Sequence, residues 1–167
     1  MNYKIRKKER KDCAGVARVI TVAWNETYRG IVSDEFLDSL YINEEVRAHN
    51  SYNNFNKKEN HQYVLEINNE VVGFIKVGKS NVTEDDNCGE IYALYIINKY
   101  KGYGFGKKLI EAGIKELKLM NFDKMVIGCL EGNPSNNFYK HIGGKFIKTR
   151  IFENLQLLEN VYYFEKI

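Results

Sequence analysis

A glycine-rich hexapeptide, Lys101-Gly102-Tyr103-Gly104-Phe105-Gly106, has residue types that suit phosphate binding. It stands between an apolar stretch and a stretch with helical periodicity, and a helix N-terminus offers unpaired N–H groups and the positive end of the helix dipole. Glycines let an anion approach the backbone closely, and Lys107 and Lys108 add positive charge. The segment predicts an anion site, although a flexible turn without a ligand would have the same composition.

Two common phosphate motifs do not fit this turn. A Walker loop would need glycine at position 101 and Ser or Thr at position 108, and both positions hold lysine. A dinucleotide-binding fingerprint that begins at Gly102 would need its third glycine at position 107, which is also a lysine. The turn is therefore not predicted to belong to either nucleotide-binding class.

A second segment, residues 133–146, contains a short and well-delimited helix. Asn133 suits an N-cap, Pro134 suits the first helical position, and Gly143 suits a left-handed stop. Tyr139 lies within this helix, and a phenol with a pKa near ~10 is protonated at neutral pH and can donate a proton. A packing tyrosine is the alternative, because the chain has twelve tyrosines.

Apolar periodicity predicts the elements that position these two segments. Strands are expected at 3–7, 62–67, 71–77, 90–97, 124–130, 145–152 and 161–167. Helices are expected at 12–24, from N-cap Ser33 to Tyr41, at 106–117 and at 133–141. Within 43–60 we expect one or two helical turns followed by a mobile loop.

The predicted order of elements indicates an α/β fold with one mixed sheet. The sheet has about seven strands flanked by about four helices, in a single domain that spans residues 1–167. The strands at 62–67 and 71–77 form an antiparallel hairpin around Asn68-Asn69-Glu70. The apolar strand at 90–97 is expected at the centre of the sheet, covered on both faces.

Together the two segments resemble the GNAT superfamily of N-acetyltransferases. The family's cofactor motif, [Q/R]-x-x-G-x-[G/A], matches 101–106 except that Lys101 replaces Gln or Arg. Its later motif, approximately N-x-x-A-x-x-[FL]-Y-x-x-x-G-F, is matched by Asn133 and, one position earlier than the motif places them, by Tyr139 and Gly143. Asn136 replaces the small residue, and Gly144-Lys145-Phe146 lengthens the final part.

The resemblance is clear over about 62–150 and looser toward the N-terminus. There, residues 23–31 look like the first helix and loop of small-molecule members, some of which acetylate polyamines. It implies a GNAT-type fold and acetyl-CoA as the cofactor. It assigns cofactor contacts to Leu94, Tyr95, Ile96, Lys101, Gly102, Tyr103, Gly104, Phe105, Gly106, Lys107, Asn133, Asn136 and Tyr139.

These contacts have distinct implied roles. The backbone at 94–96 would hold the pantetheine arm and stabilise the oxyanion of the reaction. The amides of 102–107 would receive the pyrophosphate. Asn133 would contact the pantetheine, unless it is only a helix cap.

The resemblance also implies a proton donor and a proton acceptor. Tyr139 would donate a proton to the leaving thiolate, and Glu90 would accept the proton of the amine, directly or through water. A charged residue at the start of a strand is the alternative for Glu90. Tyr92 could instead orient a water molecule.

The acceptor pocket is expected on the first two helices and their connecting loop. Trp24, Tyr28 and Tyr92 are its predicted lining, with Glu26 and Glu35 available to attract a cationic amine. Core packing is the alternative for Trp24.

Composition excludes several other classes of protein. The formal charge of +3 is too small for a clustered nucleic-acid surface. Cys13, Cys88 and Cys129 form no CxxC pair, and with the histidines they give no metal-ligand spacing, so no metal site or disulfide is expected. The charged N-terminus predicts no signal or membrane anchor, and we expect a cytoplasmic protein.

The sequence thus predicts an N-acetyltransferase that moves an acetyl group from acetyl-CoA to a primary amine. The acceptor would be a small molecule such as a polyamine, or a protein N-terminus. Cys129 lies mid-strand and no nucleophile is evident, so transfer should be direct, in a ternary complex. A non-catalytic CoA-binding regulatory domain is the alternative, and the last strand could pair across a homodimer or finish the sheet.

Overall fold

The computed structural model describes residues 2–152 and 155–167 of the chain. The strands are β1 (Tyr3–Lys7), β2 (Gln62–Ile67), β3 (Glu70–Lys79), β4 (Cys88–Ile96), β5 (Lys124–Leu130), β6 (Lys145–Phe152) and β7 (Leu157–Phe164). The α-helices are α1 (Cys13–Tyr28), α2 (Asp34–Ile42), α3 (Glu44–Asn53), α4 (Phe105–Leu119) and α5 (Ser135–His141). Three short 3₁₀ turns are η1 (Arg10–Asp12), η2 (Lys57–Glu59) and η3 (Asn98–Tyr100).

The strands form one mixed sheet in the order β1-β2-β3-β4-β5-β7-β6. β4 and β5 are parallel, whereas the pairs β1–β2, β2–β3, β5–β7 and β6–β7 are antiparallel. The prediction of a mixed α/β fold with seven strands is confirmed. The described residues contain five α-helices rather than about four.

The chain divides into two compact units. Unit 1 comprises residues 2–76 and Ala93–Gly113, and unit 2 comprises Val77–Tyr92 with residues 114–152 and 155–167. β3, β4 and α4 each contribute residues to both units. The expectation of a single domain over 1–167 stays a prediction.

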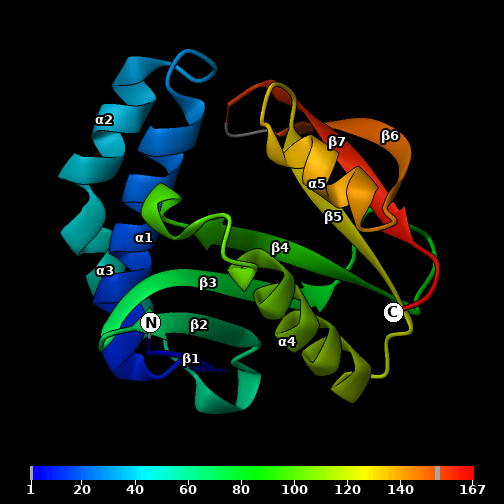
Figure 1. Ribbon diagram of the computed structural model, residues 1–167, viewed down its shortest axis with the longest axis horizontal. Helices are drawn as coiled ribbons and strands as arrows, with labels where there is room; N and C mark the ends of the chain where they lie inside the picture. Colours follow the sequence, from blue (N-terminus) through cyan, green and yellow to red (C-terminus); the bar gives the residue numbers. More distant parts are fainter. Residues whose placement is uncertain (1, 153–154) are drawn as a thin grey trace. The chain divides into compact units, whose positions relative to one another are not determined.

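The core of unit 1 lies between α1 and the sheet. Val16 and Val19 on α1 pack with Val64 of β2 and Phe74 of β3, and β1, β2 and β3 lie side by side in Figure 1. These apolar residues recur every three or four positions, which explains why α1 was predicted. The helix runs four residues beyond the predicted end, to Tyr28, which is itself buried.

The helix α3 is longer than the sequence predicted. It spans ten residues, where one or two turns and a mobile loop were expected, and it contains no buried residue. It is tied to α1 by a polar contact, because Arg47 Nη2 donates to Thr21 Oγ1 at 2.6 Å. A helix that is held by polar contacts needs no apolar stripe, so the spacing of apolar residues in the sequence could not reveal α3.

The predicted hairpin of β2 and β3 is confirmed, and its turn explains its register. Asn68 and Asn69 have φ values of 50° and 66°. A two-residue turn with positive φ at both positions matches the twist of the flanking strands, and asparagine tolerates this conformation better than most residues.

Unit 2 is built around β5, β7 and β6, which lie next to one another in Figure 1. Cys88 of β4, Val126 of β5 and Val161 of β7 form a buried cluster. β7 begins at Leu157, four residues earlier than predicted, because its first residues pair with the end of β6. The expectation that β4 is covered on both faces is wrong at Tyr92, which is 45% exposed.

No helix within residues 2–152 and 155–167 is both long and apolar enough to cross a membrane.

Candidate functional site

The glycine turn of unit 1 has the backbone geometry of an anion site. Gly102 and Gly104 have φ values of 84° and 79°, a region that other residues enter only with strain. A Cβ built on either glycine would meet no atom within 4 Å, so the space above both is open. α4 begins directly after them at Phe105.

Contacts on both sides of the turn fix its position within unit 1. Phe105 is buried and packs edge-on against Tyr3, with ring centroids 5.0 Å apart. The amide of Asn98, where η3 begins, donates to Glu26 Oε2 at 2.7 Å. Glu26 was expected to attract the acceptor amine, and this bond instead occupies one of its oxygens.

The N-terminus of α4, directly after the turn, favours an anion. The first helical hydrogen bond of α4 is the one that Lys108 N donates to Gly104 O at 3.2 Å. The amides before it, of Phe105, Gly106 and Lys107, have no acceptor within the helix. Partial burial lowers the pKa of Lys101, and the charge of Glu26 opposes this shift. These groups can bind a phosphate by backbone donors and the helix dipole.

The predicted pantetheine-binding residues lie on the last part of β4. The parallel pairing of β4 with β5 runs from Cys88 to Ile91, so Leu94, Tyr95 and Ile96 lie past its end. Ile96 is buried, and Leu94 and Tyr95 are half-buried. Their role in cofactor binding stays a prediction.

Two predicted acceptor residues belong to an aromatic cluster in unit 1. Trp24 packs against Tyr28 at 4.6 Å, Phe36 at 5.7 Å and Tyr95 at 6.1 Å between ring centroids. Trp24 and Tyr28 are only 8% and 5% exposed. This geometry favours core packing for both, and an acceptor could touch only their edges. Glu35, on α2, is exposed.

Glu90 lies in a buried charged network of unit 2. Arg150 Nη2 on β6 donates to Glu90 Oε1 at 2.8 Å, and Arg150 Nε donates to Glu159 Oε2 on β7 at 2.6 Å. Ser80 Oγ lies 3.4 Å from Glu90 Oε2. Burial lowers the pKa of Arg150, but its hydrogen bonds to Glu159 and Glu90 raise it overall. The guanidinium is therefore a fixed positive charge between two carboxylates.

Tyr92 stands two residues from Glu90 on the same strand and hence on the same face of the sheet. Its hydroxyl donates to the carbonyl of Lys79, and its ring fills the space beside Gly78. Burial, and then the charge of Glu90, raises the pKa of Tyr92. Its hydroxyl is already engaged by the carbonyl, so the water-orienting role suggested for it loses support.

The opposite face of unit 2 carries α5 and Tyr139. Tyr139 is 6% exposed, and its ring lies 6.1 Å from that of Tyr162 on β7. The predicted helix is confirmed over Ser135–His141, with Asn133 Oδ1 accepting from the Ser135 amide at 2.9 Å. Asn133 therefore acts as a cap, and its proposed contact with a cofactor stays untested.

Asn136 is a structural anchor of α5. Its Nδ2 donates to the carbonyls of Leu130 and Asn133 at 2.9 and 2.8 Å. Its Oδ1 accepts from Tyr162 Oη at 2.7 Å and from Asn160 Nδ2 at 3.1 Å. These four bonds use both donors and both lone pairs of the amide. The geometry favours this anchoring role over the predicted cofactor contact.

The three cysteines are buried thiols. Burial raises the pKa of Cys129 to about 12, and the charge of Glu159 adds to the shift. A thiol of this kind is a poor nucleophile at neutral pH, since the thiolate is the reactive form. Among the described residues, no group of three or more His, Cys, Asp or Glu lies close enough to hold a metal ion.

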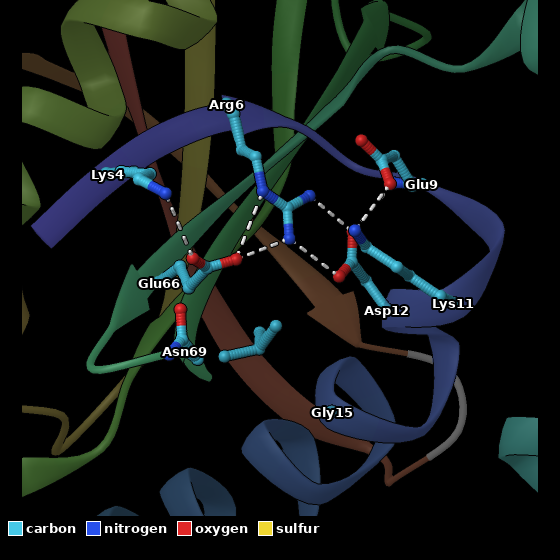
Figure 2. Close-up of a pocket in the computed structure, with 9 residues that line it drawn as sticks. Lys4, Arg6, Glu9, Lys11, Asp12, Gly15, Glu66 and Asn69 are labelled. Atoms are coloured by element: carbon cyan, nitrogen blue, oxygen red, sulfur yellow. Dashed lines mark hydrogen bonds and ion pairs between the residues drawn. The ribbon is translucent and has the colours of Figure 1, made fainter.

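A charged hollow of about 640 Å³ in unit 1 contains none of the predicted site residues. Figure 2 shows Arg6 between Glu66 and Asp12 in this hollow, with Arg6 Nη2 2.6 Å from Glu66 Oε2 and Arg6 Nη1 2.7 Å from Asp12 Oδ2. The charged residues of the hollow are largely paired with one another, and these ion pairs hold η1 against β1 and β2.

Sequence reasoning missed Arg150, Glu159 and Ser80. Arg150 and Glu90 are sixty positions apart, and only the order of strands in the sheet brings them together. The sole signal in the local sequence is that Arg150 and Glu159 are charged residues inside β6 and β7. Charged residues in a strand are equally typical of a face that is exposed to solvent.

Comparisons with known proteins agree with this architecture. Residues 23–143 match the acetyltransferase (GNAT) family. The chain is 27% identical over 142 residues to the uncharacterized N-acetyltransferase YuaI of Bacillus subtilis, covering 81% of this chain and 76% of that protein. It is 28% identical over 95 residues to an N-alpha-acetyltransferase of Sulfurisphaera tokodaii, covering 52% and 57% of the two chains.

A solved structure has the same fold. The PaiA N-acetyltransferase of Thermoplasma acidophilum, determined in complex with coenzyme A, superposes with a TM-score of 0.78 at 20% identity, over 98% of this chain and 100% of that chain.

Proposed function

The chain belongs to the acetyltransferase (GNAT) family, and we propose that it transfers the acetyl group of acetyl-CoA to a primary amine by direct transfer in a ternary complex. The observation that carries the proposal is the turn at Gly102 and Gly104, open above both glycines and leading into the N-terminus of α4. We further propose that residues 1–167 act as one acetyltransferase domain.

The residues of the turn fit the pyrophosphate of coenzyme A. The open space above the two glycines would admit phosphate oxygens that a Cβ would keep away. The amides of Phe105, Gly106 and Lys107 are donors at a helix N-terminus, where negative charge is favoured. Lys101 would contribute charge, although it replaces the Gln or Arg of the family motif. We assign the backbone the larger share of binding.

Acetyl-CoA, when bound, supplies an acetyl thioester whose carbon accepts the lone pair of the amine and whose sulfur leaves as a thiolate. Backbone amides of Leu94, Tyr95 and Ile96 would orient the pantetheine arm and donate to the oxyanion. Asn133 would contact the pantetheine.

Tyr139 would supply the proton for the leaving sulfur. Its phenol hydroxyl is a hydrogen-bond donor, and its ring is held by Phe138 and Tyr162, with centroids 5.5 and 6.1 Å away. A side chain held in this way can present Oη in one orientation, which efficient proton transfer requires.

Glu90 would take the proton of the incoming ammonium. Its carboxylate is 4% exposed, so we expect the proton to pass through a water molecule rather than directly. Arg150 Nη2 donates to its Oε1 at 2.8 Å, which gives the buried carboxylate a cationic partner.

The acceptor is an amine of a polyamine-like small molecule or of a protein N-terminus. The matched segment 23–31 favours the former by its resemblance to small-molecule members. The similarity to the N-alpha-acetyltransferase of Sulfurisphaera tokodaii favours the latter. A non-catalytic CoA-binding domain would bind the same cofactor, but no contact in either unit favours it.

An amine panel tests the reaction and the acceptor class together. The protein is mixed with acetyl-CoA and a polyamine, an amino sugar, an amino acid or a peptide with a free N-terminus, and free CoA thiol is measured. We expect one class to raise thiol release far above the rate without amine. The same peptide with a blocked N-terminus and the acetylated polyamine are the matched controls. Cofactor binding without thiol release from any class would identify the non-catalytic alternative.

The substitution Gly104→Ala tests the turn. Its Cβ meets open space, so the effects are the strain of a positive φ, about 1–2 kcal/mol, and the loss of room above the turn. We expect the Kd for CoA to rise by about tenfold. Gly30→Ala is the matched control, because Gly30 has φ 82° and equally open space in the same unit. Equal CoA affinity in the Gly104 variant and the wild type would remove the turn from cofactor binding.

The substitution Tyr139→Phe tests the proton donor. Loss of a positioned general acid should lower kcat by about 100-fold or more, with the Kd for CoA unchanged. Tyr163→Phe is the control, since Tyr163 lies on β7 and faces away from Tyr162 and Tyr139 by strand alternation. A wild-type rate of thiol release in Tyr139→Phe would exclude Tyr139 as the acid.

A further inference from the structure

The side chain of Arg150 on β6 reaches Glu90 on β4 across β7 and β5, and β5 has a glycine where the side chain crosses it. β5 lies between β4 and β7 in the sheet. A Cβ on Gly128 of β5 would collide with the carboxylate of Glu159 and lie 2.8 Å from Arg150 Nη2. Gly128 is not among the residues with positive φ, so its role is to leave room rather than to adopt an unusual backbone conformation.

The network treats the two oxygens of Glu90 differently. Oε1 accepts the bond from Arg150 at 2.8 Å, whereas Oε2 accepts from Ser80 Oγ at the longer distance of 3.4 Å. Ser80 is itself held, because its hydroxyl accepts from the Val82 amide at 3.1 Å. The carboxylate is therefore fixed in orientation, and Oε2 keeps capacity for a proton.

Other groups around Glu90 do not replace Arg150. Burial raises the pKa of Cys88 and of Tyr92, with smaller contributions from acidic neighbours that include Glu90, so both stay protonated at neutral pH. Lys148 on β6 donates to the carbonyl of Val82 at 2.7 Å. Glu159 adds a second negative charge. Arg150 is thus the cation that the structure pairs with Glu90.

We propose that Arg150 positions Glu90, the residue that accepts the proton of the amine. Its guanidinium passes beside Gly128 and donates to Glu90 Oε1, and Glu90 Oε2 accepts the proton. This rests on the proposed function, in which Glu90 is the base. The ammonium nitrogen keeps the electron pair of its N–H bond, and the proton goes to Oε2 directly or through one water molecule. Glu159 holds the guanidinium from its other side.

Two substitutions should move the pH dependence of kcat/KM in opposite directions. Arg150→Met leaves two buried carboxylates without their cation, so the acid limb of the profile, the fall in kcat/KM toward low pH, should move to higher pH. Glu159→Gln removes the second carboxylate that binds Arg150, so that the guanidinium charge acts on Glu90 alone. The acid limb should therefore move to lower pH. A merely structural network would lower stability in both variants without shifting the limb.

The gap at Gly128 gives an independent test. Gly128→Ala should shift the acid limb upward as Arg150→Met does, because the new Cβ displaces the Glu159 carboxylate that holds Arg150 Nε and crowds Arg150 Nη2, so the guanidinium moves away from Glu90. Gly89→Ala is the matched control, since its Cβ would meet the side chain of Leu117 on the opposite face of the same strands. Urea unfolding and CoA affinity confirm that each variant is folded. Arg150→Lys should recover part of the wild-type profile.

The outcomes separate this inference from the proposed function. Thiol release by the wild type, loss of the acid limb in Glu90→Gln and opposite shifts in the two charge variants would support the positioning role. Thiol release with an unshifted limb in Arg150→Met would overturn the positioning role alone. A wild-type protein that releases no thiol with any amine would overturn the proposed function and this inference together.

Discussion

The backbone conformation of Gly102 and Gly104 is the constraint on which the cofactor end of the proposed site depends. Their φ values of 84° and 79° turn the chain from the end of β4 into α4, and side chains other than glycine would strain this path. Because Phe105 is buried immediately after the turn, α4 starts at a fixed place in unit 1, directly after the two glycines and the open space above them. A backbone site of this kind would tolerate Lys101 where the family motif has Gln or Arg, since the proposed binding groups are amides.

Much of the fold could be predicted because most elements bury a regular apolar stripe. The strands Gln62–Ile67 and Lys124–Leu130 were predicted to the residue, and the Asn68-Asn69 turn identified their hairpin partner. The helix Glu44–Asn53 was underestimated because it buries no residue and is tied to α1 through Arg47. The spacing of apolar residues indicates which elements are buried. It does not indicate an element that is held by polar contacts.

The candidate site was predictable where a motif specifies backbone, and much less so where it depends on side chains. The glycine turn and the helix of Tyr139 follow from local residue types. The partners of Glu90 do not, because the sheet order β4-β5-β7-β6 and the small residue at Gly128 bring Arg150 to it from sixty positions away. Asn136 and Trp24 show the converse. Both were predicted as ligand contacts from their place in a pattern, and their observed hydrogen bonds and ring contacts favour a role within the fold.

The central claim is that the acetyl group passes directly to the amine, and a single-turnover experiment tests it most directly. The protein in excess is mixed with acetyl-CoA that carries an isotopically labelled acetyl group, with and without the amine acceptor, and intact protein and products are measured by mass spectrometry. The account predicts an unlabelled protein in both samples, because the cysteines are buried and the pKa of Cys129 is raised to about 12. With the amine present, labelled product and free CoA should form in equal amounts. An acetyl label on the protein that the amine then removes would contradict direct transfer.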